Sequence, residues 1–353
     1  MSIFVIGYYA LLLGASCLAA YFNKRSLFML LFTLTLVSFI IGIVGGVSAL
    51  WFVTGAAALI LLAGMTAYGF REFLVQILPG EASKEFKTAP LTAAFGMFVI
   101  FTYLVMGIFA PLIAPHGEAE VIASAFAPAD DTMLLGADQL GRDIFSRIVY
   151  GTRNSVGLAL AATVLAFLLG AIAGLLAATK GGWFDQLMGR IADVIMSIPS
   201  LIFALLMLSI FGPSIPVIIG AVAVIYAPRV FRLTRAVAGN VVVMDYIEAA
   251  KLRGEGTWYL IRKEILPNST APLVAEFGLE FCFVFLLVAG LSFLGLGIQP
   301  PTADWGSMVR ENATLISFGD ITPLIPAAAI ALLTVAVNFV VDWMLHRSSG
   351  LKE

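Results

Sequence analysis

Long apolar runs, broken by short charged segments, make up most of this chain. A run of about 20 apolar residues is long enough to cross the roughly 30 Å hydrocarbon core of a bilayer as a helix. Residues 27–70 contain no charged residue and are long enough for two crossings, with a hairpin expected at Gly45, Gly46 and Ser48. The pattern predicts nine crossings: Ile3–Phe22, two within residues 27–70, Pro90–Ala114, Val156–Thr179, Ile191–Phe211, Ile215–Ala227, Pro272–Ile298 and Ile321–Trp343.

These crossings predict an all-α, polytopic membrane protein. Hydrophobic residues account for 61% of the chain and charged residues for 12%, against about 25% charged residues in ordinary soluble proteins. The charged segment Glu81–Thr88 is the expected internal boundary. It predicts an additional three-helix membrane unit with its linker at residues 1–88, followed by a six-helix unit at residues 89–353.

The basic residues predict how the helices are oriented, because Lys and Arg concentrate in cytoplasmic segments. Placing residues 245–268 in the cytoplasm puts sixteen of the 20 basic residues on that side and leaves Arg142, Arg147, Arg153 and Arg310 outside. Nine crossings then place the N-terminus outside and the C-terminus in the cytoplasm. An eight- or ten-crossing arrangement would move either Lys24 with Arg25, or Arg71 with Lys84 and Lys87, to the wrong side.

The most informative stretch is a charged island at residues 245–268, between two apolar runs. It predicts two short helices joined by a glycine turn. Asp245 is expected to cap the first helix with Glu248 as its capping-box partner, and Gly254 to adopt a positive φ. Pro267 is expected to end the second helix. Because a charge at the bilayer centre costs about 2.5–3.5 kcal/mol on insertion scales, the island should project into the cytoplasm as a docking element.

The island also carries a family resemblance. Its spacing of Glu248-Ala249-Ala250, Gly254 and Ile265-Leu266-Pro267-Asn268 resembles the Glu-Ala-Ala loop by which ABC importer permeases grip their ATPase. The segments Leu135–Ser155 and Leu291–Met308 resemble the second permease subunit of the dipeptide/oligopeptide subgroup. With Gly181–Ser200, the resemblance covers the chain from about Pro90 onward and leaves residues 1–88 outside it.

The resemblance implies a type I ABC importer permease core with four kinds of partner: a second, related permease, two ATPase subunits, an external substrate-binding protein and the bilayer. ATP and magnesium would be bound by the ATPase subunits, with no cofactor in this chain. The complex would lie in the cytoplasmic (inner) membrane of a bacterium or archaeon. Peptides are the implied cargo, and nickel, glutathione and antimicrobial peptides are carried by related importers. The implied ATPase-coupling residues are Asp245, Glu248, Ala249, Ala250, Gly254, Ile265, Leu266 and Pro267.

Other classes of function lack their expected signals. The sequence contains no GxxxxGK[ST] phosphate loop and no nucleophile elbow, which disfavours an enzyme. His116 and His346 fall on opposite sides of the predicted topology, so no metal site is expected, and nothing indicates nucleic-acid binding. The competing class is an ion-coupled secondary transporter or channel, in which ionisable pairs or broken helices are expected in both halves. A structural or assembly role stays open for the first three helices.

Two further groups of residues are candidates for sites. Leu140, Ile144 and Ile148 recur at helical spacing, which predicts an amphipathic helix on the outer membrane surface. This helix and Gln299–Met308 are expected to line or cover the external mouth where a binding protein docks, with plain interfacial packing as the alternative. Trp305 is expected to be a membrane-interface anchor. The external candidates are Asp138, Gln139, Arg142, Asp143, Gln299, Pro300 and Trp305.

Candidates within the crossings are few. Asp193, Glu276 and Glu280 are the pore candidates, with a snorkelling or partner-facing role near the inner interface as the alternative. The translocation path is therefore expected to be lined mainly by small, apolar and hydroxyl side chains, with selectivity in the external protein. Gly170 and Gly174 have the GxxxG spacing that permits close helix packing.

Overall fold

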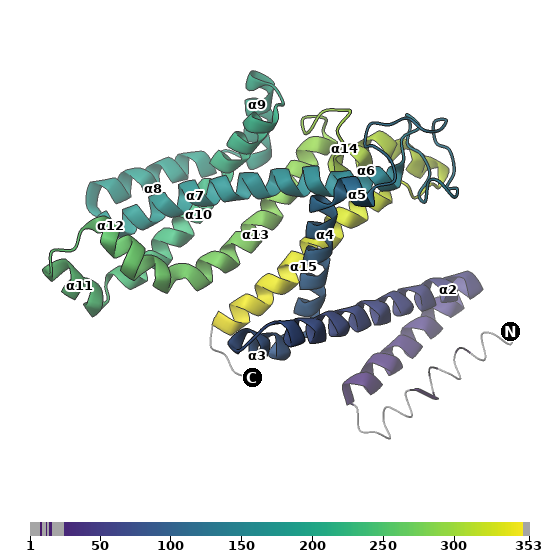
Figure 1. Cartoon of the computed structure of the whole chain (residues 1–353), viewed down its shortest axis with the longest axis horizontal. Coiled ribbons are helices and arrows are strands. Elements are labelled where there is room, and N and C mark those ends of the chain that lie inside the picture. The colour runs from purple at the N-terminus through teal and green to yellow at the C-terminus, as the bar shows by residue number, and fades with distance from the viewer. Residues whose placement is uncertain (1–7, 9–11, 13, 16–24, 349–353) are drawn as a thin grey trace. The chain divides into compact units, whose positions relative to one another are not determined.

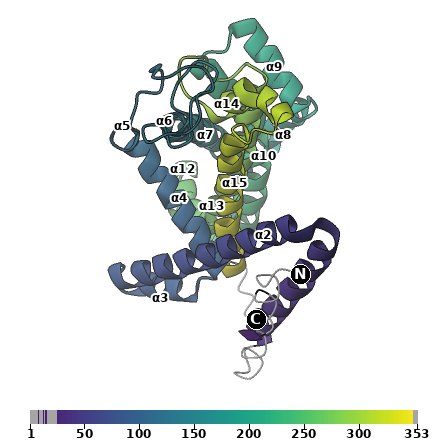
Figure 2. The same ribbon diagram turned by 90° about the vertical axis from the view of Figure 1, so that its right-hand side faces the viewer.

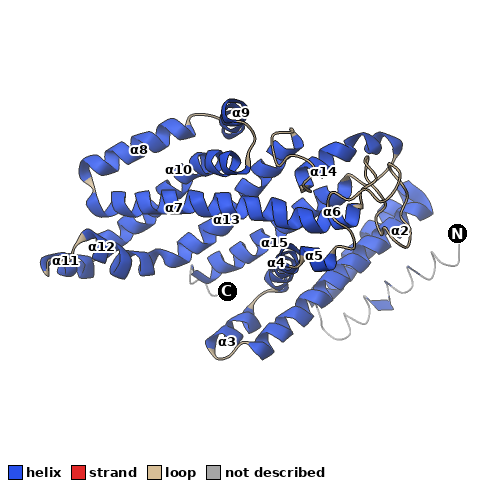
Figure 3. Cartoon of the chain, turned by 45° about the horizontal axis from the view of Figure 1, so that its top comes forward, coloured by secondary structure: helices blue, strands red, loops and turns tan. Residues whose placement is uncertain are grey.

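The computed structural model describes residues 8, 12, 14–15 and 25–348, so the expected first crossing, Ile3–Phe22, lies almost wholly outside the described residues. The described part is helical and contains no strand, only two isolated antiparallel bridges (Figure 3). The chain divides into two compact units, Met1–Lys87 and Thr88–Glu353.

The first unit contains α2 (Arg25–Ile77) and α3 (Glu81–Thr88). Helical backbone continues through Gly45, Gly46 and Ser48, so no loop interrupts the helix at the expected hairpin. An apolar segment without proline or charge keeps its helical hydrogen bonds, because lipid offers the backbone no other partner. At 53 residues, a straight helix would measure about 80 Å. The α2 ribbon instead changes direction sharply partway along its length (Figure 1).

The second unit contains the remaining helices. Two π-helical turns each join a short helix to a long one, and one 3₁₀ turn extends the end of another helix. The turns are Thr152–Val156, Leu260–Ile265 (both π) and Ala313–Phe318 (3₁₀). The helices are α4 (Leu91–Ile108), α5 (Ala110–Ile113), α6 (Ile144–Gly151), α7 (Gly157–Lys180), α8 (Gly182–Met196), α9 (Ser200–Phe211), α10 (Ile215–Val242), α11 (Asp245–Leu252), α12 (Thr257–Tyr259), α13 (Leu266–Phe293), α14 (Trp305–Asn312) and α15 (Leu324–Ser348).

Six stretches of helix among the described residues are long and apolar enough to cross a membrane. The predicted crossings at Pro90–Ala114, Val156–Thr179, Ile215–Ala227, Pro272–Ile298 and Ile321–Trp343 each correspond to one of them, with shifted ends. The six are Ala58–Ile77, Leu91–Ile108, Ile144–Lys180, Ile215–Val242, Thr257–Phe293 and Leu324–Arg347.

Two of these stretches are longer than predicted because a π-helical turn joins a short helix to a long one. Residues 144–180 run from α6 through Thr152–Val156 into α7, so the expected separate helix on the outer surface is wrong. Its apolar positions also differ from the expectation, since α6 begins at Ile144 and Leu140 lies in the preceding loop. A π turn inserts one residue and continues the helix with its faces shifted.

The predicted crossing Ile191–Phe211 is not a single helix. It consists of the end of α8 and the whole of α9, which meet at an angle of 85°. Pro199 explains the break, because proline donates no backbone N–H and disfavours helical backbone in the preceding residue, Ile198. Figure 1 shows α9 standing away from the direction of α8.

The packing of α7 against α10 is the most extensive in the second unit. A Cβ atom added at Gly170 would lie 2.4 Å from the Ala227 carbonyl oxygen, and one at Gly174 would lie 2.8 Å from the Phe231 carbonyl oxygen. The close approach that the GxxxG spacing permits is therefore present at this pair. Elsewhere in the unit, α15 lies against α4 and α13 (Figure 2).

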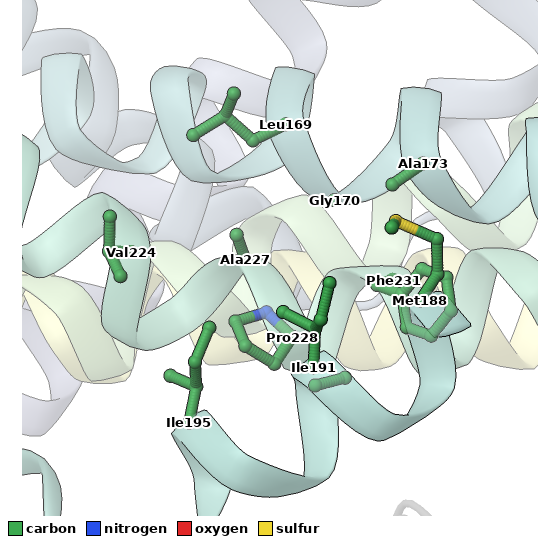
Figure 4. Close-up of a pocket in the computed structure, with 11 residues that line it drawn as sticks. Leu169, Gly170, Ala173, Met188, Ile191, Ile195, Val224, Ala227, Pro228 and Phe231 are labelled. Atoms are coloured by element: carbon green, nitrogen blue, oxygen red, sulfur yellow. The ribbon is translucent and has the colours of Figure 1, made fainter. Parts of the chain in front are cut away.

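The helix α8 lies beside α7 and α10 but leaves a cavity of about 200 Å³ between them. Its wall is apolar, as Figure 4 shows. Two exposed ion pairs, Arg232 with Asp193 and Arg235 with Asp185, join α10 to α8 beside this cavity. The lining residues are Leu169, Gly170, Ala173, Met188, Ile191, Ala192, Ile195, Val224, Ala227, Pro228 and Phe231.

The glycine contact gives a direct prediction for stability. Gly170→Ala should lower the free energy of unfolding by about 1–3 kcal/mol, because the added methyl group forces α7 and α10 apart. Gly157→Ala is the matched control, since a Cβ at that exposed glycine of the same helix would meet nothing within 4 Å. Thermal unfolding of the purified protein measures both. Equal melting temperatures for the two variants would contradict the close packing.

Candidate functional site

We call the end of the second unit that the basic residues predict to be cytoplasmic the inner end, and the opposite end the outer end. The inner end is formed by α11 and the turn that follows it. α11 begins at Asp245, with Met244 as the residue before the helix and no side-chain capping bond. The predicted Asp245 cap and Glu248 capping box are therefore wrong. Both carboxylates instead lie in the first helical turn, where they interact favourably with the positive end of the helix dipole.

One face of α11 is buried in the chain's own core. Ile247 and Ala250 are fully buried, in a cluster that includes Leu175, Val241 and Ile265. Ala250 and Ile265 therefore face inward and do not offer a surface to another protein. This corrects the expectation that they belong to the outward contact, and it follows from the need of a two-turn helix to bury an apolar face.

The other face of this region is exposed and partly apolar. Leu252 is 84% exposed, Val243 78% and Trp258 66%, and Tyr246 lies nearby in sequence on α11 with 43% exposure. Asp245, Glu248 and Ala249 are also exposed. An exposed aromatic and aliphatic surface with charged groups around it is typical of a protein-binding site. We call the exposed residues Val243–Gly254 and Trp258 the inner surface.

Gly254 closes the turn after α11 with a φ of +85°, which confirms the predicted positive φ. Its amide donates to the Lys251 carbonyl at 2.9 Å, and the Glu255 amide donates to the Ala250 carbonyl at 3.2 Å. A Cβ at Gly254 would meet no atom of the chain within 4 Å. The glycine is therefore required by the backbone conformation and not by crowding within this chain.

The expectation that Pro267 ends the second helix of the island is wrong. Pro267 lies in the first turn of α13, within helical backbone that is continuous from Thr257 to Phe293. The π turn at Leu260–Ile265 directly precedes it and accommodates the ring and the missing N–H. Leu266 and Pro267 are exposed, and Asn268 donates to the Glu264 carbonyl at 2.7 Å.

The outer end of the unit holds a buried cluster of four charged side chains. Arg142 Nε lies 2.7 Å from Asp138 Oδ2, and Arg142 Nη2 lies 3.0 Å from Glu311 Oε2. Arg147 reaches the same two carboxylates at 3.3 and 3.4 Å. We call Asp138, Arg142, Arg147 and Glu311 the outer ion cluster. Two cations and two anions balance, which is how buried charges are tolerated.

A second polar contact joins the same segments next to the cluster. Ser155 donates to Asp304 Oδ1 at 2.7 Å and accepts from the Trp305 amide at 2.9 Å. The indole of Trp305 is fully buried and donates to the Ile148 carbonyl at 3.0 Å. Glu118 accepts from the Ala303 amide at 2.7 Å. These bonds connect segments about 150 or more residues apart in the sequence, and they hold the start of α14 against α6 and the π turn Thr152–Val156.

Several external candidates do not line an open mouth. Asp138, Arg142, Asp143 and Trp305 are buried, and Asp143 caps α6 by accepting from the Ser146 amide at 2.9 Å. Trp305 cannot be a membrane-interface anchor, because its ring is enclosed by protein. These side chains can be buried because their polar groups form hydrogen bonds and ion pairs with one another and with the backbone nearby. The other external candidates, Gln139, Gln299 and Pro300, are exposed.

Two outer turns are closed by aspartates. Asp130 accepts from the Thr132 hydroxyl and amide and from the Met133 amide, and these bonds lower its pKa. Asp320 accepts from the Thr322 amide and hydroxyl, which lowers its pKa in the same way. A lowered carboxyl pKa means that each turn keeps its bonds at neutral pH and loses them as the pH falls through that pKa.

The pore candidates lie in different environments. Glu280 is 2% exposed, and its Oε2 has no hydrogen-bond partner in the described part of the chain. Glu276 lies one turn before it and is half-buried. Asp193 is exposed and paired with Arg232, so it bridges two helices near the surface. Sequence reasoning missed Arg229, which attracts both glutamates electrostatically from α10. In the described ranges, no three His, Cys, Asp or Glu side chains gather as a metal site.

The six candidate spans of the described residues define a polytopic helical membrane protein. The chain belongs to the family described as binding-protein-dependent transport system inner membrane component, whose pattern matches residues 166–349.

Relatives support this membership. The "Dipeptide transport system permease protein DppC" of Alkalihalophilus pseudofirmus is 35% identical over 264 residues, covering 74% of this chain and 86% of the relative. The "Probable D,D-dipeptide transport system permease protein DdpC" of Escherichia coli is 34% identical, covering 72% and 86%. The "Glutathione transport system permease protein GsiD" of Pectobacterium atrosepticum is 36% identical, covering 59% and 69%.

A solved structure titled as an amino acid ABC transporter with histidines has a TM-score of 0.44 at 20% identity, covering 57% of this chain and 94% of that chain. This overlap is too low to define a shared geometry.

The outer ion cluster predicts a large effect of a single charge. Arg147→Gln should lower the free energy of unfolding by about 3–5 kcal/mol, because it leaves two buried carboxylates with one cation. Arg153→Gln is the control, since Arg153 is exposed and forms no ion pair with a described residue. The thermal melting temperature of the purified complex should fall for the first variant and stay near that of the wild type for the second. The same melting temperature for both would contradict the account.

Proposed function

We propose that this chain is a permease subunit of an ATP-driven importer for peptides, and that it forms half of the translocation path. The observation that carries the cargo class is the agreement among relatives: the Alkalihalophilus and Escherichia proteins are named for dipeptide transport at 35% and 34% identity. The glutathione relative is named for another small peptide. The partners in the proposed complex are a second related permease, two ATPase subunits that bind ATP and magnesium, and an external binding protein.

The proposed ATPase-docking site is the inner surface. Its support is the exposure of Leu252, Val243 and Trp258 beside charged residues at the end of a long helix. Of the eight coupling residues expected from sequence, Asp245, Glu248, Ala249 and Gly254 lie on this surface. Leu266 and Pro267 are exposed further along the chain, whereas Ala250 and Ile265 hold α11 in place from the inside.

In the proposed mechanism, the ATPases close on ATP and push on α11. The buried face of α11 contacts the π turn Leu260–Ile265, which in turn contacts α7 and α10, so the push is transmitted to both helices through this turn. Because α7 and α10 pack through glycines, they are expected to move as one body. Alternating access of the path to the two sides of the membrane follows from that movement.

The proposed orientation places the inner surface and the C-terminus in the cytoplasm and the outer ion cluster outside. Its support is the excess of basic residues on the side of α11. With an added three-helix unit at residues 1–88, the N-terminus lies outside. The proposed domain boundary, between that unit and a transport unit at residues 89–353, is supported by the division of the chain near Lys87. We propose assembly, a partner contact or lipid adaptation as the role of the added unit.

A pair of variants at Gly254 tests the function and the docking site together. Wild-type importer in proteoliposomes should take up tripeptides when ATP and the binding protein are supplied. Gly254→Val should reduce this uptake at least about tenfold, because a β-branched residue is strongly disfavoured at positive φ. Gly254→Asn is the matched control and should retain most uptake, since asparagine tolerates the left-handed region.

Membrane insertion and the amount of each variant are measured alongside uptake. Equal uptake by Gly254→Val and the wild type would show that the turn at Gly254 does not couple this chain to the ATPase. ATP-dependent uptake of other solutes but of no peptide would instead contradict the cargo assignment.

A further inference from the structure

A second cavity, of about 190 Å³, lies where α8, α9 and α10 meet. It is centred on the elbow that Pro199 makes between α8 and α9. Unlike the apolar cavity of Figure 4, its wall carries hydroxyl groups and a guanidinium. The lining residues are Ile195, Met196, Ile198, Pro199, Ser200, Phe203, Ile225, Tyr226 and Arg229.

Arg229 is the charged group of this wall, and its N–H groups are not used. It forms no hydrogen bond or ion pair with any residue in the described ranges. Its guanidinium carbon lies 4.9 Å from the ring centroid of Phe283 and 5.6 Å from that of Tyr226. The Tyr226 hydroxyl donates to the Phe283 carbonyl at 3.1 Å, which fixes one ring. The two rings therefore orient the guanidinium and leave its donors for an acceptor from elsewhere.

Arg229 is exposed in this chain taken by itself, and its position along α10 gives its expected depth in the membrane. It lies 14 residues after Ile215, the first residue of α10. At 1.5 Å per residue this is about 21 Å along the helix, less than the roughly 30 Å of the hydrocarbon core. Charged side chains at such depth face protein or a water-filled cavity, and they commonly mark the path of a solute.

The first turn of α9 adds donors to the same wall. α9 begins at Ser200, after Pro199, and no side chain caps its first backbone N–H groups. The Ser200 hydroxyl forms no hydrogen bond with a described residue. Free N–H groups at a helix N-terminus attract anions. They supplement the guanidinium, which is the group that gives the cavity its charge.

Two acidic side chains of α13 interact electrostatically with Arg229. Glu276 and Glu280 of α13 both attract it, although neither comes within ion-pair distance. Glu280 is nearly fully buried and has an oxygen without a partner in the described part of the chain. A cation and two carboxylates thus occupy one region without neutralising one another directly. Such a region suits a solute that carries both charges.

We propose that this cavity is a transient site for the C-terminal carboxylate of a peptide on the translocation path, held by Arg229 and Ser200. This inference rests on the proposed function, since it takes peptides as the cargo. Glu276 and Glu280 offset part of the Arg229 charge, which favours a zwitterionic peptide over a simple anion and keeps binding weak enough for release. The site places a specificity element in a path that the sequence alone predicts to be lined by small and apolar groups.

The test compares a library of tripeptides with the same library in C-terminally amidated form. The complete importer in proteoliposomes is supplied with ATP and saturating binding protein, so that differences in capture do not limit the rate. Wild type should move the free acids faster than the amides. Arg229→Gln should reduce this rate ratio by roughly tenfold, the effect expected for one charge-assisted hydrogen bond. Arg229→Lys, which keeps the charge, should retain part of the ratio.

Arg232→Gln is the matched control, because Arg232 is an exposed arginine of the same helix that is already paired with Asp193. It should leave the ratio unchanged. If Arg229→Gln slows acids and amides equally, the site is overturned while the peptide cargo stands. If the wild type transports neither library, the proposed peptide cargo is wrong, and the proposed carboxylate site is wrong with it.

Lipid phosphate is the other source of an anionic oxygen. The assay is therefore repeated in vesicles of phosphatidylcholine alone and with added phosphatidylglycerol. The proposal predicts that the Arg229→Gln effect follows the peptide carboxylate in both. An effect that follows the phosphatidylglycerol content instead would assign the cavity to lipid and overturn the proposal.

Discussion

The close contact of α7 with α10 is the constraint on which the second unit depends. At Gly170 and Gly174 the backbone of one helix reaches the carbonyls of the other, with no side chain between them. In lipid, where apolar burial alone does not drive helices together, such close packing holds helices in a fixed position. α7 continues from α6 beside the outer ion cluster, and α10 leads to α11 at the inner surface. The two ends of the unit are therefore connected through one tightly packed pair.

Charge placement follows from the same low-polarity surroundings. At the outer end, Arg142 and Arg147 are buried only because Asp138 and Glu311 neutralise them at 2.7–3.4 Å. Near the inner end, Arg232 and Arg235 are exposed and paired across to α8. Arg229 is also exposed, but it lies nearer the start of α10 and contacts two aromatic rings, with no described acidic partner within 4 Å. That difference is why a site at Arg229 is worth testing.

Properties that depend on local sequence were predictable, and those that depend on distant partners were not. The apolar runs predicted most of the crossings, and Gly254 was placed at positive φ because only glycine adopts that backbone readily. The break at Pro199 was overlooked, although proline within an apolar run is a signal for it. Pro267 was misplaced because a π turn before it lets the helix continue. The burial of Trp305 and Arg147 depends on partners up to 157 and 164 residues away, which local patterns do not reveal.

We propose that the inner surface, and not another exposed apolar surface of this chain, contacts the ATPase. Photo-crosslinking amino acids placed at Leu252 and at Leu206 of α9 compare two exposed leucines, 84% and 56% accessible. In the complete importer, mass spectrometry should find the ATPase crosslinked to position 252 and not to position 206. An ATPase crosslink from position 206 with none from 252 would contradict the account.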